Sequence, residues 1–271
     1  MSQRARSPDF VSCQRLAGKE EIAEAGEAEI LIWKEVLFGA ELLLLYASPV
    51  YYGLGIPHGD DSAVMVIPGF LSSDHYLTQL NSWLERIGYR PYNSGIDINA
   101  ECPNLLIRTR LHDTLELALR DTGGKVHLIG HSLGGVIARS IAGQRPRDIA
   151  SVITLAAPFR GTIAHSSILR AAEVVRRQIL AEHSNVLPGC YTSRCTCNFI
   201  ESLRGRIPRS ILQTAIYTKD DGVVDWRCCR TGDPERDFQV PGTHIGLAFN
   251  SSAYTVIAQR LAKASKLASP R

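Results

Sequence analysis

The chain has 271 residues and a formal net charge of +3 at pH 7, with 45% hydrophobic and 21% charged residues. These proportions are typical of a folded protein with a sizeable apolar core, and the length fits one α/β domain with additions or two smaller domains. The basic residues are scattered, and so mild an excess of positive charge does not favour a nucleic-acid partner. The sequence contains no internal repeat, no phosphate-binding glycine loop and no HExxH motif.

The N-terminal part differs in pattern from the rest. Its first twenty residues are polar and basic without an apolar core, so they do not resemble a secretory signal, and we expect a cytoplasmic protein. Helical spacing of apolar residues follows, which predicts an N-terminal helical extension over residues 1–60. Residues 42–56 are uncharged but interrupted by Pro49, and fall short of the roughly 18 apolar residues of a spanning helix. One expectation is that these residues pack against the remaining domain. The alternative is that residues 30–57 make peripheral contact with a membrane.

From residue 61 to the C-terminus, strand-like and helix-like segments alternate. Residues 63–67 form a continuous apolar run, as expected of a strand buried on both faces of a parallel sheet. The predicted elements that follow are a helix over 75–87, a strand over 90–98, a helix over 105–120, strands over 151–157, 211–218 and 236–240, and a final helix. Such alternation predicts βαβ units, hence an α/β fold with a mostly parallel central sheet flanked by helices.

A G-x-S-x-G motif lies between a strand and a helix. The apolar run at 126–129 leads into Gly130-His131-Ser132-Leu133-Gly134, after which apolar residues recur at helical spacing. This arrangement is typical of a nucleophile elbow, a sharp turn that presents a serine, and predicts Ser132 as nucleophile. The backbone N–H groups of Leu133 and of Phe70, which follows strand 63–67, are the expected oxyanion donors. A glycine-rich turn without chemical role is the alternative, and the flanking strand and helix disfavour it.

The alternation of strand-like and helix-like segments stops after the strand predicted over 151–157. No clean strand is predicted over residues 159–210, which contain a helix-like stretch and a loop with three cysteines. An insertion at the sheet edge where the nucleophile emerges predicts a cap or lid over a pocket.

A serine nucleophile needs a base and a carboxylate that orients the base. His244 lies between the last strand and the last helix, at the sheet edge expected for Ser132. Among three acids after strand 211–218, Asp221 precedes a glycine turn and is the predicted partner, with Asp220 solvated and Asp225 in a salt bridge or cap. Surface or packing roles are expected for the other histidines: His58, His75, His112, His127, His131, His165 and His183.

Five short motifs carry a family resemblance. They are IPGF at 67–70, GHSLGG at 130–135, APFRGT at 157–162, KDDGVVDW at 219–226 and GTHIGL at 242–247. In this order they resemble bacterial serine esterases and lipases of the α/β-hydrolase fold, over residues 62–271. The resemblance implies carboxylic-ester hydrolysis through an acyl-enzyme on Ser132, with Asp221 as the acid and a role in lipid metabolism. It implies no cofactor and no metal. Pro68 stands where many lipases carry His, so the oxyanion loop is expected to differ in shape.

Two other functions use the same residues differently. An acyltransferase would keep the triad, exclude water and admit an alcohol. A non-catalytic binding protein of this fold would normally have lost a triad member, whereas all three candidates are present here. The expected partner is a small-molecule or lipid ester.

Seven cysteines are many for a chain without a signal peptide, and five fall between residues 190 and 229. Free buried thiols are one interpretation. A zinc site formed by Cys190, Cys195, Cys197 and the pair Cys228 and Cys229 is another, although the chain lacks a C-x-x-C pair. A third interpretation ties the cap to the acid loop by disulfides. We predict that, in an oxidising environment, at least one bridge joins a cysteine within 190–197 to Cys228 or Cys229.

Overall fold

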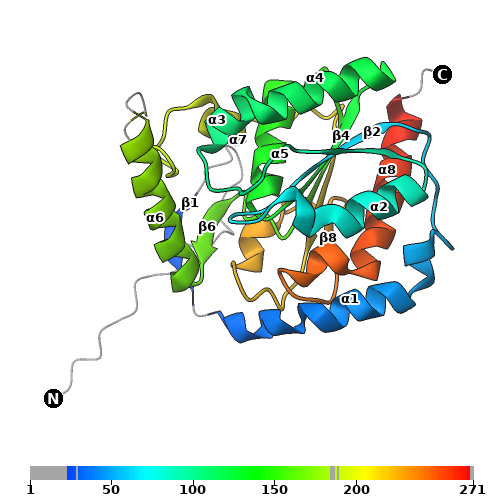
Figure 1. The fold of residues 1–271 in the computed structure, drawn as a ribbon, viewed down its shortest axis with the longest axis horizontal. Helices are drawn as coiled ribbons and strands as arrows, with labels where there is room; N and C mark the ends of the chain where they lie inside the picture. The colour runs from blue at the N-terminus through cyan, green and yellow to red at the C-terminus, as the bar shows by residue number, and fades with distance from the viewer. Residues whose placement is uncertain (1–22, 29, 184–186, 188, 269–271) are drawn as a thin grey trace.

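The computed structural model describes residues 23–28, 30–183, 187 and 189–268. Its centre is a six-stranded sheet, which Figure 1 shows between layers of helices. The strand order is β3-β2-β4-β5-β7-β8, and every neighbouring pair is parallel. The strands are β2 (Ala63–Ile67), β3 (Arg90–Asn93), β4 (Val126–His131), β5 (Ile149–Leu155), β7 (Leu212–Tyr217) and β8 (Asp237–Gln239). The predicted parallel α/β sheet is confirmed.

Helices cover both faces of the sheet. Successive residues of a strand point to opposite faces, so Met65 packs in one apolar core and Val66 in the other. The core on the Met65 side is covered by α3 (Pro103–Arg108), α4 (Arg110–Thr122), α5 (Leu133–Gln144), α6 (Ser166–Glu182) and α7 (Asn198–Arg204). The core on the Val66 side is covered by α1 (Phe38–Ala47), α2 (Thr78–Arg86) and α8 (Ser251–Ala268). This double cover explains why β2, β4 and β5 are buried along their whole length.

The strand register places the chemically interesting loops at one edge. Ile67 at the end of β2 pairs with Gly130 of β4, and Leu155 at the end of β5 pairs with His131 and with Ile216. The carboxyl ends of these parallel strands therefore meet beside Ser132, which follows β4 directly. Ligands of open α/β sheets bind at this edge.

The structure corrects the predicted helical character of the N-terminal extension. Residues 23–27 form β1 (Ala23–Glu27), which pairs in parallel with β6 (Gly161–Ala164) in a separate two-stranded sheet. The prediction of no strand within 159–210 is therefore also wrong. Both predictions failed because the pairing of two short, distant segments leaves little trace in the local sequence. The 3-10 helices η1 (Ile32–Leu37) and η2 (Pro49–Tyr52) flank α1. The expectations for the first twenty residues lie outside the described residues.

One predicted strand is shorter than expected, and one predicted helix is divided in two. The strand predicted to reach residue 98 ends at Asn93, because the Asp74 carboxylate accepts the backbone N–H groups of Ser94 and Gly95 at 3.1 and 2.8 Å and turns the chain away. The helix predicted over 105–120 is divided at Thr109, whose φ of −120° and ψ of −106° are not helical, into α3 and α4.

Residues 42–56 form the rest of α1, a turn and η2, not one continuous helix. Within the described ranges, no helix is long and apolar enough to cross a membrane.

The predicted disulfide between the insertion and residues 228–229 is wrong. Cys190, Cys195, Cys197 and Cys229 are free thiols, so the disulfide that Cys228 forms does not involve them. The three cysteines of the insertion pack in the large core of α3 to α7, where Cys190 Sγ lies 3.7 Å from Cys102 Sγ. Cys229 belongs to a different apolar cluster, with Tyr217 and Val224. The two groups of cysteines therefore face different parts of the interior.

Candidate active site

Ser132 occupies a strained turn between β4 and α5. Its φ of 51° and ψ of −123° are unusual for a residue with a side chain. A Cβ on Gly130 would lie 2.3 Å from the carbonyl oxygen of Gly134, and a Cβ on Gly134 would lie 2.1 Å from that of Ile67. Only glycine permits the helix to pack this closely behind the strands. The turn therefore has the geometry predicted for a nucleophile elbow.

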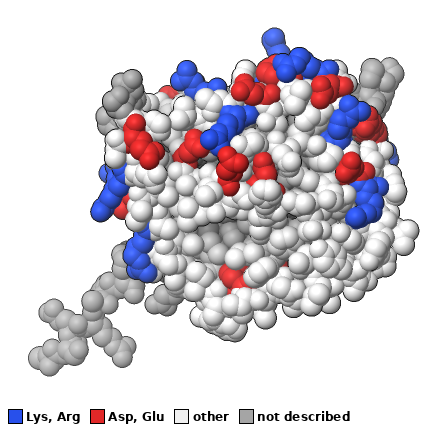
Figure 2. Space-filling model, in the orientation of Figure 1, with Lys and Arg blue, Asp and Glu red and all other residues white. Residues whose placement is uncertain are grey.

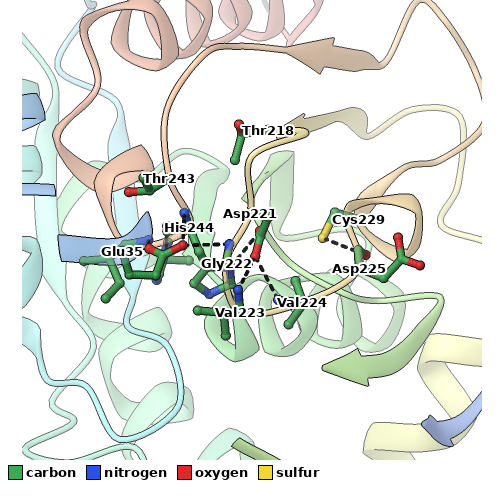
Figure 3. A network of polar contacts seen from close by, with 12 residues as sticks. Glu35, Thr218, Asp221, Gly222, Val223, Val224, Asp225, Cys229, Thr243 and His244 are labelled. Carbon is green, nitrogen blue, oxygen red and sulfur yellow. Dashed lines mark hydrogen bonds and ion pairs between the residues drawn. The ribbon is translucent and has the colours of Figure 1, made fainter. Parts of the chain in front are cut away.

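Asp221 and His244 form a buried pair at the same edge (Figure 3). His244 Nδ1 lies 2.8 Å from Asp221 Oδ2, and the other oxygen, Asp221 Oδ1, accepts the backbone N–H groups of Val223 and Val224 at 2.9 and 2.8 Å. Burial by itself lowers the pKa of His244, but the charge and hydrogen bond of Asp221, helped by the charge of Glu35, raise it above its ordinary value. The carboxylate is thus oriented to stabilise a protonated imidazole.

The other two acids of this loop are engaged elsewhere. The exposed carboxylate of Asp220 pairs with Lys34 at 2.8 Å. Asp225 accepts the backbone N–H of Arg227 at 2.9 Å, caps a short 3-10 helix and pairs with the Arg227 guanidinium at 3.3 Å. Of the three acids, Asp221 is therefore the one that contacts His244, as the sequence predicted.

His131 connects the elbow to the histidine loop. Its Nε2 lies 2.8 Å from the carbonyl oxygen of His244, and the two rings are 5.0 Å apart between centroids. Burial lowers the pKa of His131 to about 3, so the ring is neutral at pH 7 and Nε2 donates to that carbonyl. Among the described residues no hydrogen bond joins Ser132 Oγ to His244. In enzymes without substrate this contact is often long and tightens on binding.

The loop after β2 runs beside Ser132. A Cβ on Gly69 would lie 3.0 Å from Ser132 Cβ, so Phe70 follows the point of closest approach. Asn99 holds the loop: its side-chain Nδ2 donates to the Pro68 carbonyl oxygen at 2.8 Å, and its backbone carbonyl oxygen accepts the Leu71 N–H at 2.9 Å. The buried Oδ1 of Asn99 has no partner within the described part of the chain.

The two predicted oxyanion donors differ in origin. Leu133 is the first residue of α5, where backbone N–H groups lack intrahelical acceptors, and Phe70 lies in the loop beside Ser132. The Phe70 ring lies 6.4 Å from that of Tyr191, so the insertion reaches this loop.

Glu35 is a site residue that sequence reasoning missed. It is 5% exposed, and Oε1 accepts the N–H groups of Gly222 at 2.7 Å and His244 at 3.0 Å, while Oε2 accepts that of Ile245 at 2.7 Å (Figure 3). It therefore contacts both loops that carry the acid and the histidine. The only sequence signal was a charge within an apolar segment.

Further residues hold the histidine loop and were also missed. Glu41 Oε1 accepts the Thr243 N–H at 2.7 Å, and the Tyr76 hydroxyl donates to the Ile245 carbonyl. Burial raises the pKa of the Glu41 carboxyl. The role expected for His131 was packing alone, whereas it bonds directly to the backbone of this loop.

Residues 23–268, apart from the undescribed positions, contain no group of three or more His, Cys, Asp or Glu side chains arranged to hold a metal ion. Of the cysteines considered as zinc ligands from the sequence, Cys190, Cys195 and Cys197 lie in one apolar cluster and Cys229 in another.

The parallel sheet, the Ser132 turn and the buried pair that follows β7 and β8 define an α/β-hydrolase fold. Solved structures of the same fold include the following two. One is a structure from the pair of metagenome-derived lipolytic enzymes LipS and LipT, with a TM-score of 0.51 at 18% identity and with 78% of this chain and 96% of that chain covered. The mature lipase BlEst2 of Bacillus licheniformis has a TM-score of 0.51 at 15% identity, with coverage of 76% and 94%.

Sequence comparisons match a smaller part of the chain. Residues 109–185, which include Ser132, match the family model of the PGAP1-like alpha/beta domain. A triacylglycerol lipase of Burkholderia plantarii is 27% identical over 134 residues, 46% of this chain. The match spans only 37% of that lipase.

Proposed function

We propose that the protein is a serine carboxylic-ester hydrolase of the esterase and lipase type. The observation that carries the proposal is the buried Asp221–His244 pair, 2.8 Å between Oδ2 and Nδ1, at the sheet edge where Ser132 emerges. A carboxylate, an imidazole and a serine on a strained turn form the constellation that activates a hydroxyl for acyl transfer. The lipase similarity of the sequence agrees with an ester substrate.

In the proposed mechanism His244 removes the proton of the Ser132 hydroxyl as Oγ attacks the ester carbonyl. Asp221 fixes the imidazole tautomer with Nδ1 protonated and stabilises the resulting imidazolium. The N–H groups of Phe70 and Leu133 bind the oxyanion. His244 then returns the proton to the departing alkoxide, which leaves as an alcohol. Water, deprotonated by His244, cleaves the acyl-enzyme to release the acid and regenerate Ser132.

An apolar surface beside the site favours a lipid ester. We define the apolar strip as the exposed hydrophobic side chains of residues 31–54; the most exposed, each 56% exposed or more, are Leu31, Trp33, Val36, Leu43, Leu44, Tyr52 and Leu54. Figure 2 shows that charged side chains gather over α3 and α4, whereas the surface over α1 is largely uncharged. Glu35 comes from the same segment of the chain but is buried, and it accepts the backbone N–H of His244. We therefore propose that the strip makes peripheral contact with a lipid surface that holds the substrate.

An ester screen tests the activity. Turnover of p-nitrophenyl esters of increasing acyl length, with and without added alcohol acceptors, should be present in the wild type and absent in Ser132→Ala. Free acid as the main product supports a hydrolase. Transfer to the alcohol in place of hydrolysis would instead indicate an acyltransferase, and no turnover of any ester would contradict the proposal.

Vesicle sedimentation tests the surface. With phosphatidylcholine vesicles we expect the wild type to pellet and the double variant Leu43→Ser, Leu44→Ser to remain in the supernatant. Leu117→Ser, at an exposed position of α4 on the charged side, is the matched control and should pellet like the wild type. Equal binding by all three proteins would contradict the proposed contact.

A further inference from the structure

The Glu35 carboxylate lies between two loops that come from separate strands. The acid loop, defined as residues 219–225, follows β7, and the histidine loop, defined as residues 241–246, follows β8. Glu35 accepts one N–H from the acid loop, at Gly222, and two from the histidine loop, at His244 and Ile245 (Figure 3). Besides the Asp221–His244 contact itself, this carboxylate is thus a direct connection between the loops.

The environment of Glu35 indicates a specific fit. A buried carboxylate is costly unless hydrogen bonds compensate the loss of water, and three N–H donors do so here. A Cβ on Gly222 would lie 2.7 Å from Glu35 Oε1 and 3.1 Å from the Leu31 carbonyl oxygen, so no side chain fits between loop and carboxylate. Glycine at 222 therefore permits the close approach that the hydrogen bond requires.

The charge of Glu35 also acts on His244. Several groups face this imidazole: Asp221 from the acid loop, Glu35 from η1 and the neutral ring of His131 from β4. Burial disfavours the protonated form, Asp221 favours it most, and Glu35 adds to Asp221 in raising the pKa of His244. Two carboxylates from different parts of the chain thus stabilise the charge that the base acquires during acyl transfer.

We propose that Glu35 is a positioning residue for the hydrolytic reaction, which sets the acid loop against the histidine loop so that Asp221 and His244 remain paired. The inference rests on the proposed function. It assigns to the N-terminal segment, which lies outside the motifs of the hydrolase domain, a direct part in the geometry of the active site. The segment that carries the apolar strip thus also carries a side chain that contacts both loops of the acid–base pair.

Three variants separate geometry from charge. Glu35→Gln keeps the size but removes the charge and one good acceptor. We expect kcat to fall about 10- to 100-fold with little change in KM, and the acidic limb of the pH profile to move to lower pH. Glu35→Asp keeps the charge but withdraws it by one methylene, so kcat should fall while the acidic limb moves less. Lys34→Gln, next to it in sequence, removes only a partly exposed ion pair with Asp220 and should behave like the wild type.

A purely structural role gives a different result. If Glu35→Gln lowers the melting temperature but folded protein keeps the wild-type kcat and acidic limb, the proposal is overturned. If neither Glu35 variant folds, nuclear magnetic resonance titration of His244 in Ser132→Ala decides the matter, because we expect the charges of Asp221 and Glu35 together to outweigh burial and to raise its pKa above the ordinary 6.5. A value at or below 6.5 overturns the proposal. This titration needs no turnover, so it distinguishes failure of the inference from an inactive wild type, which would contradict the proposed function instead.

Discussion

Asp221 Oδ2 lies 2.8 Å from His244 Nδ1, and the other oxygen of the same carboxylate accepts two backbone N–H groups of its own loop. Asp225, four residues further on, is equally buried but directs its carboxylate to Arg227. The contrast between these two aspartates makes the assignment of the acid testable.

Asp221→Asn should lower kcat about 10⁴-fold, because an amide favours the wrong imidazole tautomer and does not stabilise the imidazolium. Asp225→Asn should keep kcat within about threefold, since an asparagine still caps the 3-10 helix. Asp220→Asn removes only an exposed ion pair and serves as the control. Steady-state kinetics on one p-nitrophenyl ester compares the three variants. A larger loss of kcat in Asp225→Asn than in Asp221→Asn would show that Asp221 is not the acid.

The pH dependence follows from His244. Its neutral form is the base, and its pKa is raised above 6.5 because Asp221 outweighs the effect of burial. We therefore expect kcat/KM to rise with pH through a midpoint above 6.5 and to fall at lower pH, where His244 is protonated. Ser132→Ala measured at each pH supplies the background of uncatalysed hydrolysis. A profile that is flat between pH 5 and 8, a window chosen around the ordinary histidine value, contradicts the assignment of the base.

Two helical glycines should respond oppositely to alanine. In Gly134→Ala the new methyl group would meet the Ile67 carbonyl oxygen at 2.1 Å, so the elbow must shift, at a cost of about 3 kcal/mol or more in unfolding free energy. In Gly39→Ala nothing lies within 4 Å, and the better helix former should stabilise by up to about 1 kcal/mol. Urea denaturation measures both. Equal stability of the two variants would show that close packing behind Ser132 is not required.

The buried thiols of the insertion should be unreactive in the folded protein. Burial, with neighbouring thiols adding to it, raises the pKa of Cys190 to about 12 and that of Cys197 to about 11, so little thiolate exists at pH 8. Alkylation by iodoacetamide, followed by mass spectrometry, should modify both at least about 100-fold more slowly in native protein than in urea. Rapid native modification of Cys190 would show that the insertion does not bury it.

The sheet and the acid–base pair were predictable because their signals are local. Apolar runs identify β2, β4 and β5, the G-x-S-x-G motif identifies the turn at Ser132, and chain order places Asp221 before His244. The final helix likewise follows from helical spacing of apolar residues, and it forms α8.

Contacts between distant segments were not predictable in this way. The hydrogen bond from His244 to Glu35 spans 209 positions, and the pairing of β1 with β6 joins residues on either side of the main sheet's first four strands. Spacing also failed for the cysteines, because proximity in the chain says nothing about which apolar cluster each thiol joins. The segment 23–27 is short, and it forms a strand only because it pairs with β6.

The central claim is that Ser132 is the nucleophile, and covalent labelling tests it most directly. A fluorophosphonate probe should modify the wild type at one serine, which peptide mass spectrometry should locate at Ser132, and labelling should vanish together with ester turnover in Ser132→Ala. Thermal melting of the variant serves as the check that it remains folded. Labelling of a different serine, or full ester turnover by folded Ser132→Ala, would contradict the account.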